Sequence, residues 1–415
     1  MKIFADLHLH SHYSRATSDK MDIENLERYA KVKGVNLLGT GDFTHPLWLN
    51  ELKKKLKENN GLFQFKDKDV SFILQAEVSS IYNDGETRKI HNVILAPSFE
   101  VVDQINDFLK NYGKLESDGR PILTRIDCAE LTEKLIEISK EVMIIPAHIW
   151  TPWFSLFGSK SGFDSIEECF KDQSKNIFAL ETGLSSDPAM NWRLSALDRF
   201  ALVSNSDSHS PWPSRLGREL NVLETEMKYK EVINAIKEKN PKKFLYTIEV
   251  DPAYGKYHWD GHRIHDVSLD PKEAIKYHNL CPVCGKPLTI GVLHRVEELA
   301  DREEGFVPRN VIPFKSLLPL SELIASFYNT QDFSKKVWEE STKLTKEFGS
   351  ELNVLLNVDE ERLKILVDEK LAEIIIRNRE GKLKVQPGYD GVYGKLILNG
   401  KISNKQPQRS IDSYI

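Results

Sequence analysis

The chain has 415 residues, of which 40% are hydrophobic and 29% charged, as in an ordinary globular protein. This length exceeds one compact core and predicts two or three domains. No stretch approaches the about 18 apolar residues of a membrane span, so we expect no membrane contact and a cytoplasmic location. The formal net charge of −5 excludes a globally basic protein, so any nucleic acid must be held by a local patch.

Short apolar runs alternate with amphipathic helical stretches over the first 250 residues. Between the first two runs, for example, Asp22 can cap a helix and Gly34 can end it. Strand alternating with helix is typical of a parallel sheet, and this many repeats predicts a closed α/β barrel. The candidate strands span residues 2–10, 35–43, 71–80, 90–97, 141–149, 177–183, 200–209 and 243–250.

Residues of metal-binding type follow the C-terminal end of nearly every one of these runs. Side chains at such ends converge on one mouth of a barrel, where barrel enzymes keep their chemistry. His91 is the exception, because it lies at the start of its run. The residues at strand ends are His8, His10, Asp42, Glu77, His148, Glu181, Asp207 and His209.

The character of the chain changes near residue 251. Residues 251–310 are rich in His, Gly, Pro and Cys, and such a segment needs a staple to fold. The next part is helical over 321–349 and 359–381, where Leu363, Val367, Leu371 and Ile374 form one stripe and Gly381 a stop. We therefore predict domains at 1–250, 251–310 and 311–400, and a flexible tail at 401–415.

His8 and His10 lie two positions apart on one strand, so both imidazoles project the same way and could bind one metal ion. A lone His-x-His could equally decorate the surface. Similar residues at the ends of other strands favour a catalytic site with several metals instead. Nitrogen and oxygen ligands, with carboxylates available to bridge, suit two or three Zn²⁺, Mn²⁺, Mg²⁺ or Fe ions.

Five motifs carry a resemblance to known proteins: DLHLHSHYS at 6–14, GTGDFTHP at 39–46, AEVSS at 76–80, PAHIWTPWFS at 146–155 and SNSDSHSP at 204–211. Together they resemble the PHP (polymerase and histidinol phosphatase) superfamily of metal phosphoesterases. With the cysteine segment and the helical C-terminus, the whole chain resembles the archaeal endonuclease Q family. The resemblance implies a distorted (β/α)7-type PHP barrel, then a small zinc-binding module and a helical C-terminal domain.

The resemblance also implies a metal-dependent DNA endonuclease of DNA repair. Its substrate would be damaged double- or single-stranded DNA, nicked 5′ to deaminated bases (uracil, hypoxanthine, xanthine) and abasic sites. Water activated between the metals would attack phosphorus and leave 3′-hydroxyl and 5′-phosphate ends. The implied catalytic metal ligands are His8, His10, Glu77 as bridging carboxylate, His91, His148, Asp207 and His209.

The second motif departs from the family pattern. Where many relatives read Thr-Asp-His, this chain has Gly41, Asp42 and Phe43, with His45 two positions on. A third metal could therefore be ligated by Asp42, be ligated by His45, or be weakly held. Asp19 is a weak match for a later acidic ligand of the first motif.

The loop at 149–163 mixes aromatic residues with Gly, Ser and Lys. It is either a core-packing loop or a phosphate cradle with stacking faces. The segment 187–193 offers side chains that could read a flipped base. The candidate residues for binding DNA or the lesion are Trp153, Ser159, Lys160, Ser161, Asn191 and Arg193.

Cys281 and Cys284 form a Cys-Pro-x-Cys-Gly turn that directs two thiolates at one ion. His262 and His265, also three apart, complete a His₂Cys₂ site for one structural Zn²⁺. Two unrelated free cysteines are the alternative, disfavoured because the segment has little else to fold around. We interpret Cys128 and Cys169 as ordinary buried thiols, as expected in a reducing compartment.

The last eight residues resemble the box by which DNA-repair enzymes bind the sliding clamp, PCNA. Gln408, Ile411 and Tyr414 fit the pattern Gln-x-x-aliphatic-x-x-aromatic-aromatic, and Ile415 stands where a second aromatic is usual. The alternative is a disordered end. We predict a monomer that binds the clamp through this tail.

Two other functions compete with the endonuclease. A PHP-family small-molecule phosphatase, similar to histidinol-phosphatase, would not need a zinc module, a helical C-terminal domain or a clamp-type tail. A DNA-binding scaffold with an inactive barrel is disfavoured because a nearly full ligand set remains. The endonuclease reading accounts for all of these features.

Overall fold

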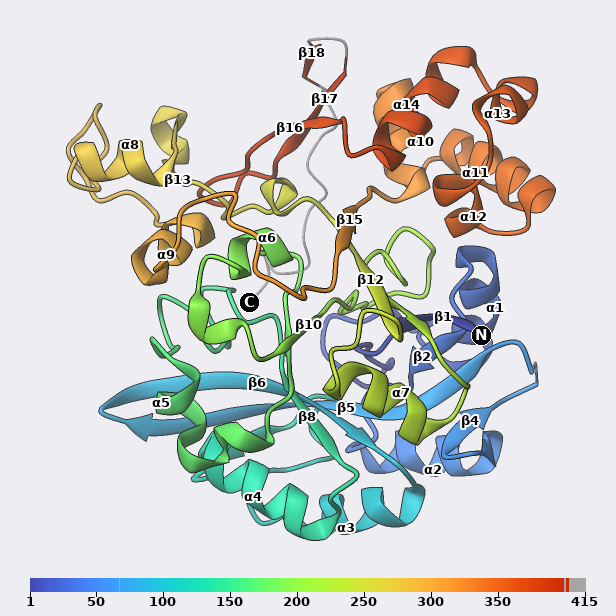
Figure 1. The fold of residues 1–415 in the computed structure, drawn as a ribbon, viewed down its shortest axis with the longest axis vertical. Coiled ribbons are helices and arrows are strands. Elements are labelled where there is room, and N and C mark those ends of the chain that lie inside the picture. Colours follow the sequence, from blue (N-terminus) through green and yellow to red (C-terminus); the bar gives the residue numbers. More distant parts are fainter. Residues whose placement is uncertain (67, 399–400, 403–415) are drawn as a thin grey trace. The chain divides into compact units, whose positions relative to one another are not determined.

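A computed structural model describes residues 1–66, 68–398 and 401–402, and the chain divides into two compact units (Figure 1). The first unit contains residues 1–183, 196–248 and 308–314, and the second contains 184–195, 249–307 and 315–415. The expected mixed α/β class and helical C-terminal region are confirmed. Within the described part of the chain, no helix is long and apolar enough to cross a bilayer.

The first unit contains strands flanked by helices. All eight expected apolar runs contain a strand, but β3, β4, β7 and β11 were not predicted. The strands are β1 (Lys2–Asp6), β2 (Leu37–Gly39), β3 (Lys57–Asn59), β4 (Leu62–Gln64), β5 (Ser71–Asp84), β6 (Glu86–Ala96), β7 (Ile122–Thr124), β8 (Met143–Pro146), β9 (Ala179–Glu181), β10 (Ala201–Val203), β11 (Leu220–Glu224) and β12 (Phe244–Glu249). The helices are α1 (Ile23–Lys33), α2 (Pro46–Lys55), α3 (Phe99–Leu109), α4 (Cys128–Ile138), α5 (Ile166–Phe170) and α7 (Tyr229–Lys237).

Backbone pairing runs through seven of these strands and returns to its start. β1, β2 and β5 pair in parallel, β6 pairs with β5 and β8, and β9 pairs with β10. Beyond the strand ends, Ile149 N donates to Glu181 O and His10 N donates to Ser208 O. These bonds connect the ends of β8 and β9, and of β10 and β1. The C-terminal ends of β1, β8, β9 and β10 are thereby brought to one region.

The expectation of a wholly parallel sheet is wrong, because β5 and β6 form a long antiparallel hairpin (Figure 1). Its register holds from Leu74 opposite Ala96 to Asp84 opposite Glu86, on either side of Gly85. The predicted strands stopped at 80 and resumed at 90 because the residues between are polar. Gly85, at the tip of the hairpin, has φ +71°, which glycine adopts without strain.

One apolar core lies between the strands and helices of the first unit. Ile3, Val93, Val203 and Ile236 belong to it and are fully buried. Burying such a side chain stabilises the fold by about 1.5–3 kcal/mol relative to leaving it exposed. Cys128 and Cys169 are also buried and free, as expected. This core fixes the strands whose ends carry the polar residues described below.

The second unit carries the cysteine segment and the helical region. Its elements are α6 (Pro188–Asn191), β13 (Asp260–His262), β14 (Val267–Leu269), α8 (Pro271–Lys276), α9 (Val292–Leu299), α10 (Leu320–Tyr328), α11 (Lys335–Phe348), α12 (Glu351–Leu356), α13 (Glu360–Leu366), α14 (Glu369–Arg379), β16 (Lys384–Gln386), β17 (Lys395–Leu398) and β18 (Lys401–Ile402). A short strand, β15 (Phe314–Ser316), precedes the helices.

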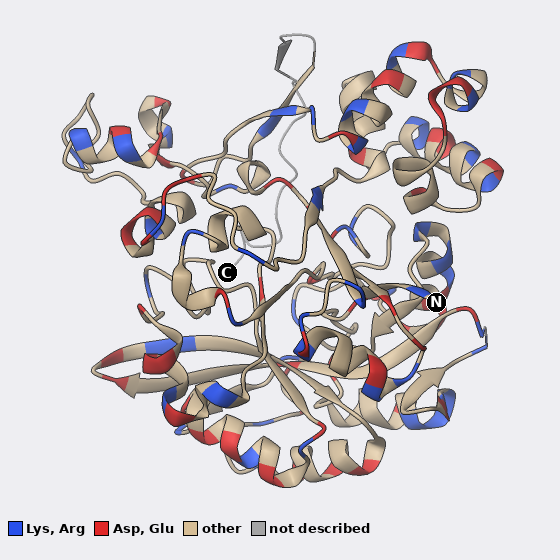
Figure 2. Ribbon diagram, in the orientation of Figure 1, with Lys and Arg blue, Asp and Glu red and all other residues tan. Residues whose placement is uncertain are grey.

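The single helical stripe expected over 359–381 is split between two helices, α13 and α14. Val367 is extended (φ −128°, ψ 168°), and Asp368 caps α14 by accepting from Lys370 N at 2.9 Å. Leu363, Val367, Leu371 and Ile374 are nevertheless all buried in one helical core. Helices α11, α13 and α14 carry residues of both signs of charge (Figure 2), including the Lys364–Glu360 pair at 2.9 Å.

The loop at 387–394 returns to the segment around residues 253–261. Trp259 N donates to Gly388 O, and Gly388 N donates to Ala253 O. A Cβ at Gly388 would lie 2.2 Å from Gly255 O, so only glycine permits this approach. Tyr389 Oη also donates to Asp266 Oδ1 at 2.5 Å. The tail residues Gln408, Ile411, Tyr414 and Ile415 lie outside the described residues.

We predict that Leu371→Ala lowers the free energy of unfolding of the helical core by about 2–5 kcal/mol, because it leaves a cavity at a fully buried position. Ile365→Ala is the matched control, since Ile365 is 81% exposed, and should change stability by less than about 0.5 kcal/mol. Urea unfolding followed by far-UV circular dichroism measures both. Equal effects would contradict the assigned packing.

Candidate metal centre

Four ligand atoms converge beyond β1, on β5 and beyond β10. They come from His8, His10, Glu77 and Asp207, and all lie within 4.8 Å of one another. His10 Nε2 lies 3.2 Å from Glu77 Oε2 and 3.1 Å from Asp207 Oδ1, and His8 Nε2 lies 3.5 and 3.6 Å from the same oxygens. Ligands about 2.1 Å from a tetrahedral metal are about 3.4 Å apart, so this spacing fits one cation.

A second group of ligand atoms shares Glu77 with the first. Glu77 Oε1 lies 2.7 Å from His91 Nδ1 and 3.1 Å from His148 Nε2, and the two imidazole nitrogens are 3.3 Å apart. Because β6 runs antiparallel to β5, the start of its apolar run reaches the same mouth. This explains the position of His91. Glu77 thus presents one oxygen to each group.

Several buried atoms of the first group lack a hydrogen bond. They are Nε2 of His8, Nε2 of His10 and Oδ1 of Asp207. An unsatisfied buried polar atom costs about 1–3 kcal/mol, and a bound cation would satisfy all three. The residues present therefore fit a metal ion at this position.

The opposite ring nitrogens of the two histidines are held by carboxylates. His8 Nδ1 lies 3.0 Å from both oxygens of Glu181, and His10 Nδ1 lies 3.0 Å from Asp42 Oδ1. A carboxylate at Nδ1 fixes the tautomer and leaves the lone pair of Nε2 for a metal. Both imidazoles are thus oriented for coordination.

The charges of the site suit cation binding. Burial opposes ionisation of Glu77, but His91, Arg120 and His8 hold its pKa well below the usual range. Burial lowers the pKa of His91 to about 3, against the attraction of Glu77. At neutral pH the carboxylate is ionised and His91 is neutral, which are the forms that coordinate metals.

His8 and His10 behave differently from His91 in the absence of a cation. Burial disfavours their charged forms, yet the carboxylates Glu181 and Glu77 raise the pKa of His8 well above its ordinary value. Asp42 has the same effect on the pKa of His10. A cation that binds here must displace these protons, so binding should weaken as pH falls.

Three residues of the site have a left-handed backbone. The φ angles are +45° at Asp42, +30° at His148 and +47° at Asp207. This region is uncommon for residues other than glycine and persists only where the surroundings hold it. At His148, the backbone N donates to Glu181 Oε2 at 2.8 Å. The strands thus end in sharp turns that return polar side chains to the centre.

Asp42 and His209 lie beside the first group without joining its converging ligand atoms. Besides His10, Asp42 accepts from Ser11 N at 2.6 Å and Ser11 Oγ at 2.7 Å, so it orients the first motif. The His209 ring lies 4.6 Å from that of His10, and its Nδ1 donates to Asp207 O at 3.0 Å. Their roles as ligands stay predictions.

The remaining candidates for a third metal lie apart from these groups. His45 stacks on Tyr13 with ring centres 4.2 Å apart. Asp19 is exposed and pairs with Lys20 at 3.3 Å. Ligation of a metal by His45 or Asp19 stays a prediction.

Two charged residues of the centre had no role assigned from the sequence. Glu181 is buried and accepts from His8, from His148 N and from Asn205 Nδ2 at 2.8 Å. Its place at a strand end had marked it as a residue of metal-binding type, but it was not assigned to the ligand set. Arg120 Nη1 lies 3.1 Å from Glu77 Oε2, and no motif in the sequence points to it.

The candidate DNA-binding residues of the loop after β8 differ in exposure. Trp153, Ser159 and Lys160 are exposed, and Lys89 Nζ lies 5.4 Å from the centre of the Trp153 ring. Ser161 is buried, and its Oγ accepts from Phe154 N at 3.1 Å. The exposed three are available to a ligand, whereas Ser161 supports the loop from within.

Asn191 and Arg193 belong to the second unit and are buried there. Asn191 Nδ2 donates to Asp187 O at 2.8 Å, and Arg193 Nη1 pairs with Glu297 Oε2 at 2.7 Å. These polar groups are engaged within the protein. Their part in reading a base stays a prediction.

The second unit brings the two histidines and two cysteines of the predicted zinc site together. His262 Nδ1 lies 3.5 Å from Cys284 Sγ, and His265 Nδ1 lies 3.7 Å from Cys281 Sγ. Desolvation opposes ionisation of Cys281, but hydrogen bonds from His262 and from the backbone of Cys284 and Val283 lower its pKa to about 6. A thiolate is the form that binds Zn²⁺.

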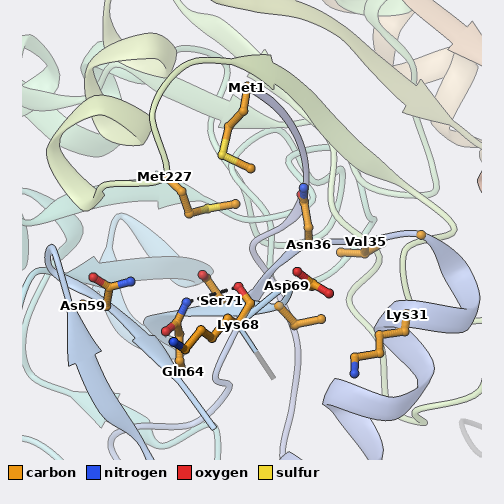
Figure 3. A pocket seen from close by; sticks show the side chains of 12 residues that line it. Met1, Lys31, Val35, Asn36, Asn59, Gln64, Lys68, Asp69, Ser71 and Met227 are labelled. Atoms are coloured by element: carbon orange, nitrogen blue, oxygen red, sulfur yellow. Dashed lines mark hydrogen bonds between the residues drawn. The ribbon is translucent and has the colours of Figure 1, made fainter. Parts of the chain in front are cut away.

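A cavity of about 670 Å³ lies at the other ends of β1, β2 and β5. Met1, Asn36 and Ser71, from the starts of these strands, line it together with Lys31 and Met227 (Figure 3). None of the converging ligand residues contributes to its lining. The cavity is therefore separate from the metal centre.

Comparisons with known sequences identify relatives over much of the chain. Residues 319–382 match the family described as the MJ0043 C-terminal domain. An uncharacterised Methanocaldococcus jannaschii protein, MJ0043, is 37% identical over 60% of this chain, which spans only 31% of that protein. The uncharacterised Bacillus subtilis protein YqxK is 30% identical over 95% of this chain and 99% of its own length.

Two solved structures are similar over the entire chain. The crystal structure of a lesion-specific endonuclease, PfuEndoQ from Pyrococcus furiosus, has a TM-score of 0.86 and 34% identity, covering 100% of this chain and 99% of that one. A structure of endonuclease Q with a 27-mer duplex carrying an abasic lesion at the active site has a TM-score of 0.84 and 34% identity, covering 100% of both chains.

We predict that Glu181→Gln lowers divalent-cation affinity about 10–100-fold, because an amide no longer fixes His8 in the tautomer that leaves Nε2 free. Isothermal titration with Mn²⁺ measures the change. Glu100→Gln, at an exposed position on α3, is the control and should bind like the wild type. Unchanged affinity in Glu181→Gln would contradict the orienting role.

Proposed function

The chain belongs to the endonuclease Q family, and we propose that it nicks damaged DNA 5′ to deaminated bases (uracil, hypoxanthine, xanthine) and abasic sites. The observation that carries the proposal is the shared carboxylate of Glu77, which faces two groups of metal-ligand type within a fold similar throughout to lesion-specific endonucleases. Two adjacent cation sites suit hydrolysis of a phosphodiester.

We propose that the first unit is a PHP-type barrel that holds a divalent cation, Zn²⁺, Mn²⁺ or Mg²⁺, at each group. Such cations would neutralise the phosphodiester and activate the attacking water. The residues of the chain hold and orient this machinery: Glu181 and Asp42 fix the tautomers of His8 and His10. We also propose that His209 is a metal ligand and that a third cation binds near Asp42 or His45.

DNA is proposed to lie along the exposed loop after β8. Trp153 offers a face for base stacking, while Ser159 and Lys160 can contact phosphate. A Zn²⁺ at His262, His265, Cys281 and Cys284 is proposed to stabilise the His/Cys segment of the second unit. Among the described residues, the apolar cluster of this segment is small and consists of Ala274, Cys281 and Leu288 with flanking apolar groups. We also propose that the protein is a monomer located in the cytoplasm.

The small-molecule phosphatase alternative is not favoured. Similarity to endonuclease Q extends over the whole chain, through the His/Cys segment and the helical region as well as the first unit. A small-molecule phosphatase that used only the barrel would not need to share the His/Cys segment and the helical region.

We predict that the protein nicks a labelled duplex one bond 5′ to a single uracil, hypoxanthine or abasic site when supplied with Mg²⁺ or Mn²⁺. His8→Ala should abolish nicking and spare DNA binding, because it removes a ligand from the first group. His278→Ala changes an exposed histidine of the second unit and is the control. Cleavage of p-nitrophenyl phosphate without any nicking would favour the phosphatase.

We also predict that the sliding clamp stimulates nicking through the last eight residues. Ile411→Ala with Tyr414→Ala removes the two proposed apolar anchors and should abolish stimulation while leaving nicking of short duplexes unchanged. Asp412→Asn alters a residue between them and should keep the response. A clamp response that survives the double change would refute the motif.

A further inference from the structure

Arg120 brings a positive charge to the carboxylate that the two ligand groups share. Its Nη1 lies 3.1 Å from Glu77 Oε2, the oxygen that also lies 3.2 Å from His10 Nε2. The Arg120 side chain is 32% exposed, whereas that of Glu77 is fully buried. The Arg120 side chain is therefore partly accessible from solvent, whereas the carboxylate that it contacts is not.

The loop that carries Arg120 is fitted closely against the first metal motif. Gly119 N donates to Tyr13 O at 3.1 Å. A Cβ at Gly119 would lie 2.2 Å from Ser14 Oγ and 2.3 Å from Asp42 Oδ2, so a larger residue cannot be accommodated without displacing the loop. The close fit of Gly119 thus fixes the backbone position of the adjacent Arg120.

Most of the hydrogen-bonding capacity of Arg120 is free for a ligand. A guanidinium has five N–H donors in a planar fork, and within the described part of the chain its side-chain hydrogen bond is to Glu77. Cations bound at both groups would share the negative charge of Glu77 and weaken its hold on Arg120. The arginine would then carry charge that is poorly compensated at the site.

A phosphodiester matches this arrangement. It has one negative charge and two non-bridging oxygens, which a guanidinium can bind through two parallel hydrogen bonds. Building on the proposed function, we propose that Arg120 is a substrate-binding residue that contacts the phosphate to be cleaved. The competing role is structural, in which Arg120 only keeps Glu77 in place for the metals.

The test compares Arg120→Gln and Arg120→Lys with Arg15→Gln. Arg15 is the matched control because it is 81% exposed and pairs with Asp118, a neighbour of Arg120, at 3.3 Å. Metal content is measured first by mass spectrometry of the loaded proteins. All three variants should retain the wild-type content, which distinguishes a phosphate contact from a structural partner of Glu77.

DNA binding is then measured with Ca²⁺ over a series of salt concentrations, on a duplex containing one abasic site. Arg120→Gln should bind more weakly and reduce the slope of log K against log salt by about one, as expected for one lost phosphate contact. With Mg²⁺, its kcat/KM for nicking should fall about 100-fold. Arg120→Lys should recover part of both losses, and Arg15→Gln should match the wild type.

The outcomes separate this inference from the proposed function. Loss of metal in Arg120→Gln, an unchanged salt slope, or equal losses in Arg15→Gln would each overturn the phosphate contact. If the wild type nicks and Arg120→Gln nicks equally well, this inference alone fails. If the wild type nicks no lesion-containing duplex, the proposed function fails as well.

Discussion

The burial of one carboxylate, that of Glu77, is the constraint on which the site depends. A charge removed from water is costly unless it is compensated nearby, so each oxygen of Glu77 needs partners. Those partners come from β6, from the turn after β8, from the extension of β1 and from the loop at Arg120. Segments far apart in sequence are thereby required to meet around one side chain.

Most of the ligands lie beyond the strands, after β1, β8 and β10, whereas Glu77 and His91 lie within the long hairpin strands β5 and β6. Apolar residues such as Ile3 and Val93 pack the core of the first unit. Beyond the strands, left-handed turns at His148 and Asp207 return polar side chains to the centre. A second layer, including Glu181 and Asp42, then orients the imidazoles. The orientation of the metal-binding imidazoles thus depends on carboxylates that contact their opposite ring nitrogens.

Much of the site could be predicted from the local sequence pattern. Where this prediction failed or stayed ambiguous, the causes are physical. His8, His10, Glu77 and His148 follow apolar runs, and strand direction converts that position into convergence. His91 looked exceptional only because the sheet was taken to be parallel. Asp42 shows a different limit, since a carboxylate that orients a histidine has the same sequence signature as one that could bind a metal. Arg120 lies in a loop without periodicity.

In the second unit, the His/Cys site could be predicted because its residues are closely spaced in the sequence. The sequence did not predict which distant residues contact this segment. The loop at 387–394 bonds to Ala253 and Trp259, so the start of the His/Cys segment is held by a glycine-rich loop from a distant part of the sequence. During synthesis, the two cysteines are made well before these glycines. The His/Cys segment can therefore complete these contacts only after residues 387–394 have been translated.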